Sequence, residues 1–367
     1  MSIDKAPNGM WRARWRDESG RQRSKSFKRK ADASAFEAET KHAMRQGDFV
    51  STAAGQITLY ALANRWLDAS PHLAAGTLAT YRRDLDRYIL PSLGTLIVAN
   101  VTDDVIQRYL AKEIKTYAAS SVHRHYRTLR TMFEWAVRRR MISSNPCANV
   151  NPPRVAASKV HYLTADEVER LAEAIAPRYR AFVLVAAYGG LRWGEMVGLR
   201  RSAVDGQRLT ITEQLVRRGD DWHREDPKTS SSRRTVLLPA SIADELQAHI
   251  DKFSQDGPDG LVFVNKDGAP IGHSFRANVW APACVKAGLA EKVYSPGKPP
   301  KIVDAPRIHD MRHTAVALAI STGAHPKAIQ QRLGHSSIAV TLNTYGHLLD
   351  GVGEELAANL DLLRKAE

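Results

Sequence analysis

Six polar residues in the second half of the chain are of the types needed to attack a phosphodiester without a metal ion. They are two arginines, a lysine, two histidines and a tyrosine, namely Arg192, Lys228, His309, Arg312, His335 and Tyr345. A protein hydroxyl can attack phosphorus while cationic side chains neutralise the charge that develops on the phosphate oxygens. No carboxylate cluster accompanies the set, and the two cysteines are far apart in the sequence. We therefore expect phosphoryl-transfer chemistry that requires no metal and no other cofactor.

The charge of the chain indicates a polyanionic partner. Its 367 residues include 53 Lys and Arg against 39 Asp and Glu, which gives a formal net charge of +14. The net charge is +5 over residues 1–50, +7 over residues 51–155 and +2 over the remainder. The basic excess therefore lies in the N-terminal two-fifths of the chain, where we expect it to hold DNA.

The sequence shows no signal for export or for insertion into a membrane. The first ten residues have no apolar signal-peptide core, and the longest apolar run, residues 181–190, is too short to span a bilayer. We expect a cytoplasmic protein with no membrane partner. Its length favours two or three domains.

Residues 1–50 are predicted to form a small sheet with a supporting helix. In the run WRARWR, residues 11–16, apolar residues alternate with arginines, so one strand face is apolar and the other basic. A second strand follows a turn, and a helix is expected from about residue 31 to 45. Strands of this kind can enter the major groove, and the candidate DNA contacts are Arg12, Arg14, Arg16, Arg23 and Lys25. The alternative is a solvated hairpin whose arginines only keep it soluble.

Residues 51–56 are small and uncharged, and we predict a linker there, followed by a helical domain over residues 57–142. One helix is expected to begin at Thr77 and stop at Pro91, and another to be capped by Thr102. Residues 122–136 carry apolar side chains at helical spacing, with basic side chains largely elsewhere on the helix. That basic face is either ordinary solvated surface or a phosphate-tracking surface, with Arg124 and Arg127 as candidate DNA contacts.

A second linker is predicted over residues 143–160, which are rich in Pro, Asn and Ser, and it precedes a domain over residues 161–367. In this domain an apolar helix ends at Gly190, and Arg192 stands at the start of a short helix with Glu195 one turn on. Lys228 lies between two strand-like runs and is expected on a flexible hairpin. A lysine there is by itself commonplace.

His309 and Arg312 are three residues apart on a predicted helix, so both can converge on one phosphate. His313 is one step further round, and we expect it to support the fold. A short helix from Pro326 to Gly334 precedes His335, and a serine at 336 or 337 is expected to cap the helix that carries Tyr345. Taken alone, such a tyrosine is by default a core residue.

Together these motifs resemble those of the tyrosine recombinases of the phage integrase family. GLRWGE, PKT, HDMRH, LGH and TLNTYGH stand in the family's order and at about its spacing. The likeness upstream is one of architecture. It implies a multidomain, mainly α protein with small β elements: a three-stranded sheet plus helix as arm-type DNA-binding domain (1–50), an all-α core-site-binding domain (57–142) and an α+β catalytic domain with a C-terminal tail (161–367).

The resemblance implies that Tyr345 attacks DNA to form a 3′-phosphotyrosine and a free 5′-hydroxyl. Four protomers would then exchange strands through a Holliday junction, integrating and excising a phage or mobile-element genome in a bacterial host. The implied roles are phosphate binding by Arg192, Arg312 and His335, general acid for Lys228, proton acceptor for His309 and support by Glu195. The implied partners are double-stranded attachment sites with core and arm sequences, a host DNA-bending protein and an excision factor, with the protein associated with the nucleoid.

Two other functions remain open at this point. A type IB topoisomerase shares the tyrosine, arginine and lysine chemistry, although the arm domain and the compact segment from LGH to TYGH argue against it. A DNA-binding regulator with vestigial chemistry is the other, and the intact candidates at all six positions oppose it. Among recombinases, residues 1–50 favour a phage or conjugative-element integrase over a chromosome-dimer resolvase.

Overall fold

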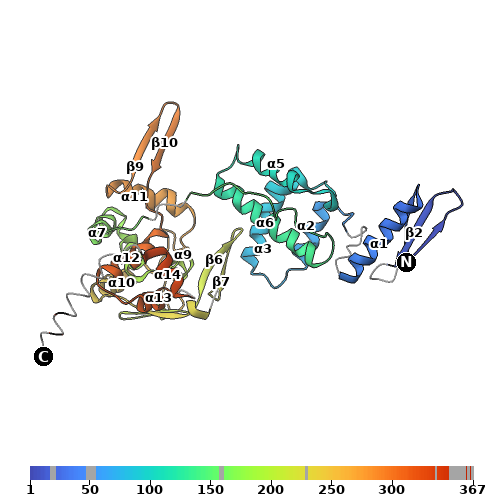
Figure 1. Ribbon diagram of the computed structural model, residues 1–367. Helices are drawn as coiled ribbons and strands as arrows, with labels where there is room; N and C mark the ends of the chain where they lie inside the picture. Colours follow the sequence, from blue (N-terminus) through green and yellow to red (C-terminus); the bar gives the residue numbers. More distant parts are fainter. Residues whose placement is uncertain are drawn as a thin grey trace. The chain divides into compact units, whose positions relative to one another are not determined.

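The computed structural model describes residues 1–16, 22–46, 55–156, 161–227, 230–334 and 337–346, together with residues 361 and 364. It divides into two compact units, Met1–Ala157 and Ser158–Glu367 (Figure 1). The described part is mainly helical with small sheets, as predicted. It contains no helix long and apolar enough to cross a membrane.

The N-terminal sheet has the predicted alternation. Its antiparallel strands, in spatial order, are β1 (Ser2–Lys5), β2 (Trp11–Arg16) and β3 (Gln22–Phe27), followed by helix α1 (Lys30–Gln46). Ala13 and Trp15 are buried, and Phe36 of α1 packs 5.3 Å from both the Trp15 and Phe27 rings, measured between centroids. The apolar face of the sheet is therefore the one covered by α1.

The other described residues of the first unit, 55–156, form helices and turns around a core of their own. Its elements are α2 (Leu59–Asp68), α3 (Ala75–Asp84), a π-helical turn (Leu85–Ile89), α4 (Leu90–Leu93), a 3-10 turn (Val98–Asn100), α5 (Asp103–Glu113) and α6 (Ala119–Arg138). Thr102 caps α5 as predicted, since its side chain accepts a hydrogen bond from Val105 N.

The boundaries predicted for the helix from Thr77 to Pro91 are wrong. The helix begins at Ala75 and continues past Pro91, because a π-helical turn starts a new helical segment in whose first turn proline is tolerated. Proline lacks only the backbone N–H that a first turn leaves unpaired.

The second unit surrounds the buried helix α8 (Arg180–Gly189), which packs on α7, α10 and α12. Its other helices are α7 (Ala165–Ala174), α9 (Trp193–Val197), α10 (Ala240–Phe253), α11 (Ala281–Lys286), α12 (Asp310–Ser321), α13 (Pro326–Leu333) and α14 (Ile338–Tyr345). Shorter turns lie at Pro177–Tyr179, Arg201–Ala203, Ser230–Ser232 and Arg276–Trp280.

Three small sheets complete the described part of this unit. They are β4–β5–β8 (Val204–Asp205, Arg208–Ile211, Arg234–Leu237), the hairpin β6–β7 (Gln214–Arg218, Asp221–Glu225) and the hairpin β9–β10 (Glu291–Ser295, Lys298–Val303). The Thr164 capping box, the Pro326 and Gly334 boundaries and the Ser337 cap are confirmed.

Two glycines end the helices that frame the candidate site. Gly190 ends α8 and Gly334 ends α13, both with a φ of +65°. A Cβ on Gly190 would lie 2.8 Å from a methyl of Leu333, and one on Gly334 would lie 2.8 Å from the Ser231 carbonyl oxygen. Both the left-handed backbone and the close packing therefore require glycine.

Candidate active site

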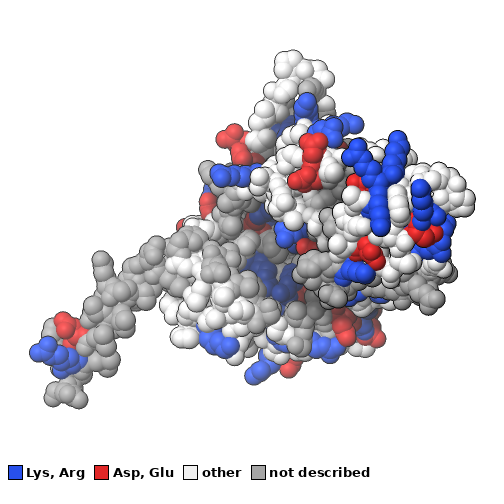
Figure 2. All heavy atoms as spheres, turned by 45° about the vertical axis from the view of Figure 1, so that its right-hand side comes forward, with Lys and Arg blue, Asp and Glu red and all other residues white. Residues whose placement is uncertain are grey.

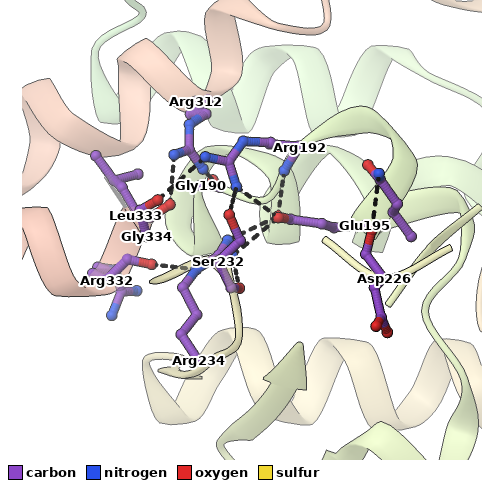
Figure 3. Close-up of polar contacts among 11 residues, drawn as sticks. Gly190, Arg192, Glu195, Asp226, Ser232, Arg234, Arg312, Arg332, Leu333 and Gly334 are labelled. Atoms are coloured by element: carbon purple, nitrogen blue, oxygen red, sulfur yellow. Dashed lines mark hydrogen bonds and ion pairs between the residues drawn. The ribbon is translucent and has the colours of Figure 1, made fainter. Parts of the chain in front are cut away.

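Arg312 and Arg192 are held by carbonyl groups at the ends of two helices (Figure 3). Arg312, in the first turn of α12, is buried, and its guanidinium donates to the carbonyl oxygens of Gly190 at 2.6 Å and Leu333 at 2.5 Å. Arg192, which precedes α9, donates to the carbonyl oxygen of Gly334 at 3.3 Å. The last carbonyls of a helix lack intrahelical donors, so they are suited to fix these cations.

The cationic cluster of Arg192, Arg234 and Arg312 favours the binding of an anion. Burial, together with the positive charges of Arg192 and Arg234, lowers the pKa of Arg312 to about 9. The side chain stays protonated at neutral pH, but its neighbours repel it. A phosphate bound here would relieve that repulsion, which is the electrostatic condition for a phosphate site.

Glu195 is the counter-charge of this cluster and is 2% exposed. Its carboxylate accepts from the Arg192 backbone N at 2.8 Å and side chain at 2.9 Å, and from two Arg234 nitrogens at 3.0 and 2.8 Å. Although burial opposes ionisation, the hydrogen bonds and charge of Arg234, followed by those of Arg192, lower the pKa of Glu195 to about 2. Its contacts fit the predicted supporting function.

Arg234 belongs to this cluster, although no motif in the sequence points to it. Its side chain is 5% exposed, and besides Glu195 it donates to the carbonyl oxygens of Arg332 at 2.7 Å and Ser232 at 3.0 Å. Its only signal in the sequence is an arginine before the apolar run TVLLP. That signal does not separate it from Arg233, which pairs with Asp226 at the surface.

Glu195→Gln should destabilise the fold in a pH-dependent way. The folded-state pKa of about 2 lies below the ordinary 4.5, so the ionised carboxylate stabilises the folded protein above pH 4.5. A shift of this size corresponds to about 3 kcal/mol, which is lost as the pH falls from 4.5 toward 2. In thermal unfolding, the difference between wild type and Glu195→Gln should be large at neutral pH and shrink below pH 4.5.

The matched control is Glu134→Gln, which removes a surface ion pair with Arg130 and should change stability little at any pH. A Glu195→Gln defect that stays constant across this pH range would contradict the prediction.

Tyr345 is the last residue of α14 and is 4% exposed. Its ring packs in an apolar cluster with Val316, Ile329 and Leu333. Burial raises the pKa of its hydroxyl to about 12, with the charge of Arg312 acting in the opposite direction. The hydroxyl is therefore protonated at neutral pH.

The histidine that contacts this hydroxyl in the described structure is His313 and not His309. The Nδ1 atom of His313 lies 2.5 Å from the Tyr345 oxygen. The His309 ring stands edge-on to the His313 ring, with centroids 5.4 Å apart. Desolvation, followed by the charge of Arg312, lowers the pKa of His309, although the residue as a whole is exposed. The sequence predicts only a supporting function in the fold for His313, so this contact is a finding of the structure.

Two of the six candidates, Lys228 and His335, lie outside the described residues, so their places in the site stay predictions. The two strand-like runs between which Lys228 is predicted contain β5 and β8, and these two strands pair antiparallel. A further hairpin, β6–β7, lies between them in the sequence, with its turn at Gly219, whose φ of +61° suits a tight turn.

The arginine face of the N-terminal sheet is partly neutralised. Arg12 and Arg14 both donate to the Asp4 carboxylate, at 2.8 and 2.6 Å, and these bonds lower the pKa of Asp4. Arg16 ends β2, and its side chain lies outside the described part of the chain.

Arg23 and Lys25 lie on the opposite face of this sheet from those arginines. They pair across the ladder with Trp15 and Ala13, and opposite residues share a face. The Lys25 ammonium lies 4.8 Å from the centre of the Phe36 ring. The five basic candidates therefore do not form one surface, and DNA contact by each stays a prediction.

Arg124 and Arg127 differ in their surroundings on α6. Arg124 Nε donates at 2.9 Å to Asp84, whose side chain is fully buried, so Arg124 has a structural partner. Arg127 is exposed.

On the face of the molecule drawn in Figure 2, Lys and Arg side chains are prominent, with Asp and Glu side chains among them.

Two protein-family models and several curated proteins match most of the length of the chain. Residues 161–351 match the Phage integrase family, and residues 59–152 match the Phage integrase central domain. The chain is 29% identical to the prophage phiRv2 integrase of Mycobacterium tuberculosis, over 97% of this chain and 93% of that protein. It is 30% identical to the integrase of Mycobacterium phage FRAT1, over 78% and 82%.

Solved structures share the fold. The Tn1549 transposon integrase in complex with circular intermediate DNA superimposes with a TM-score of 0.66 at 20% identity, over 78% of this chain and 94% of that one. A lambda integrase tetramer bound to a Holliday junction gives 0.59 at 17% identity, over 91% and 95%. With the motifs and the family matches, these likenesses place the chain in the phage integrase family of tyrosine-type site-specific DNA recombinases.

Proposed function

We propose that Tyr345 is the nucleophile with which this recombinase cuts DNA. The observation that carries the proposal is a buried tyrosine hydroxyl that senses the charge of Arg312, an arginine anchored on the same helix end as Arg192. Leu333 belongs to the apolar cluster that contains Tyr345, and its carbonyl accepts from Arg312, while the next carbonyl, that of Gly334, accepts from Arg192. A phosphate held by the two guanidinium groups would thus lie close to the hydroxyl.

The remaining residues take complementary functions. Arg192 and Arg312 stabilise charge on the nonbridging oxygens, and Glu195, with Arg234, holds Arg192 in place. His335 donates a hydrogen bond to the phosphate. We assign the same function to His309, which the family resemblance implies as proton acceptor, because the histidine in contact with the Tyr345 hydroxyl is His313. Lys228 protonates the departing 5′ oxygen. The products are a 3′-phosphotyrosine and a free 5′-hydroxyl.

Strand exchange would follow by attack of a 5′-hydroxyl from another cut strand on the phosphotyrosine. We propose that four protomers on paired attachment sites carry this out through a Holliday junction, the state in which the lambda integrase tetramer is seen. The outcome is integration, and with an excision factor also excision, of a phage or mobile-element genome. A host DNA-bending protein would bring arm and core sites together on the bacterial nucleoid.

The direct test is to map covalent protein–DNA complexes on the genomic DNA that flanks the gene for this chain. We expect adducts at two staggered positions within one short sequence, each linked through a 3′-phosphate. Adducts scattered over many sequences would favour a topoisomerase instead, and binding without adducts would favour a regulator.

Deleting residues 1–50 should abolish binding to distal arm sites and leave weak cleavage at the core site. The basic strand β2 in this segment and the net charge of +5 over these residues support a separate DNA-binding function. Mobility shifts on arm and core duplexes at several salt concentrations measure both affinities. Loss of core-site binding together with its salt dependence would contradict this division of the chain.

A further inference from the structure

We propose that His313 accepts the proton of the Tyr345 hydroxyl when the tyrosine attacks DNA. This inference rests on the proposed function of Tyr345 as the nucleophile. Nδ1 of His313 lies 2.5 Å from the phenolic oxygen, and the two rings are inclined by 52° with centroids 5.6 Å apart. The contact is therefore made by the nitrogen edge of the imidazole and not by stacking.

Tyr345 needs such a base. Its hydroxyl is buried, and burial raises its pKa to about 12, so the phenolate is scarce at neutral pH. A neutral phenol is a weak nucleophile, and an adjacent general base is one of the ways in which enzymes activate a hydroxyl. The atom that touches the hydroxyl oxygen is the candidate that geometry selects first.

His313 is in the protonation state that a base requires. Desolvation, followed by the neighbouring His309, lowers the pKa of His313, so the imidazole is neutral at physiological pH. When Nδ1 of His313 accepts the hydrogen bond from the Tyr345 hydroxyl, the single ring proton of the neutral imidazole is on Nε2. The titratable and charged groups around the ring, from its own helix, the preceding segment and α14, are His309, Asp310, Arg312, Arg307 and Tyr345.

The backbone that carries His313 is fixed on both sides. Arg312 is anchored by its bonds to the carbonyl oxygens of Gly190 and Leu333. Thr314 is fully buried, and its hydroxyl accepts from Leu163 N at 3.0 Å and donates to the Asp310 carbonyl at 3.1 Å. A base held between two anchored residues keeps its orientation through the reaction.

The proton is conserved through the cycle. In cleavage, the O–H bond of Tyr345 breaks and its proton moves to Nδ1 of His313. The phenolic oxygen forms a bond to phosphorus, and the bond from phosphorus to the 5′ oxygen breaks as that oxygen takes a proton from the proposed acid Lys228. In rejoining, a 5′-hydroxyl attacks phosphorus and gives its proton back to Lys228, the tyrosyl–phosphorus bond breaks, and Nδ1 of His313 returns its proton to the phenolate oxygen.

The test follows adduct formation on a labelled duplex from the DNA flanking the gene, nicked beside the cleavage site so that religation is prevented. His313→Asn keeps a polar group near the position of Nδ1 but cannot take up a proton. We expect it to bind this duplex like the wild type and to form the adduct about 10²–10⁴-fold more slowly.

A modified tyrosine shows whether His313 acts as a base or only supports the structure. Incorporating 3,5-difluorotyrosine at position 345 gives a phenol that ionises at a much lower pH and needs a base less. It should restore most of the adduct rate to His313→Asn. His309→Asn, altered one helical turn earlier, is the matched control: it should be slowed and gain little from the fluorinated tyrosine.

Adduct rates in His313→Asn equal to wild type would overturn the inference, as would a defect that fluorination does not relieve. If His313→Asn fails to bind DNA, the pH dependence of the rate of adduct formation tests the inference instead. The rate should rise with pH as the His313 imidazole loses its proton, with a pKa below the ordinary 6.5, and then level off, in wild type and His309→Asn alike. A rate that does not change with pH overturns the inference. Failure of the proposed nucleophile would look different, because Tyr345→Phe would then still form an adduct.

Discussion

Tyr345→Phe should bind DNA with unchanged affinity and form no covalent adduct. The substitution removes only the phenolic oxygen, while the ring keeps its apolar neighbours Val316, Ile329 and Leu333. The folded protein loses one hydrogen bond, to His313, which costs about 1 kcal/mol. Since no other group replaces the attacking oxygen, cleavage should be undetectable on denaturing gels of protein mixed with labelled nicked site DNA.

The matched control for this loss is Tyr179→Phe. Tyr179 is also a buried tyrosine of the second unit, and its ring packs edge-on against Phe275 at 4.8 Å between centroids. This variant should keep the adduct at the wild-type level. An adduct that persisted in Tyr345→Phe would mean that another residue is the nucleophile.

Predictions from the sequence succeeded where a few neighbouring residues determine the conformation. Thr164 and Glu167 form a capping box because both partners lie within one helical turn. Pro326 and Gly334 bound α13 for the same local reason, since proline suits a first turn and glycine a left-handed end. The alternation in residues 11–16 likewise follows from strand geometry alone.

Predictions failed or were missing where a partner comes from a distant part of the chain. Arg234, on β8, joins the site through its ion pair with Glu195, on α9. The two residues are far apart in the sequence, so no local spacing predicts the pair. Arg12 and Arg14 share Asp4 through strand pairing, which changes how much charge they offer to DNA. Helical spacing put His313 near His309, but which of the two meets the hydroxyl depends on where α14 packs.

Lys228→Ala should be crippled on normal DNA and rescued when sulfur replaces the scissile 5′ bridging oxygen. If Lys228 protonates the departing oxygen, its loss should slow cleavage about 10²–10⁴-fold, because an alkoxide is a poor leaving group. A thiolate leaves without a proton, so the acid becomes dispensable on the sulfur substrate. Cleavage rates of wild type and variant on both substrates measure the rescue directly.

Arg192→Ala and Arg312→Ala are the comparison variants for this rescue. The charge that these arginines stabilise lies on the nonbridging oxygens and remains when the bridging atom is sulfur, so both should gain much less than Lys228→Ala.

His313→Asn should also gain little, since a better leaving group does not remove the proton of the attacking phenol. Fluorinated tyrosine should rescue His313→Asn and sulfur should rescue Lys228→Ala, each leaving the other defect in place. Equal rescue of all variants by sulfur, or none for Lys228→Ala, would move the general-acid function to another residue, with His309 the first candidate.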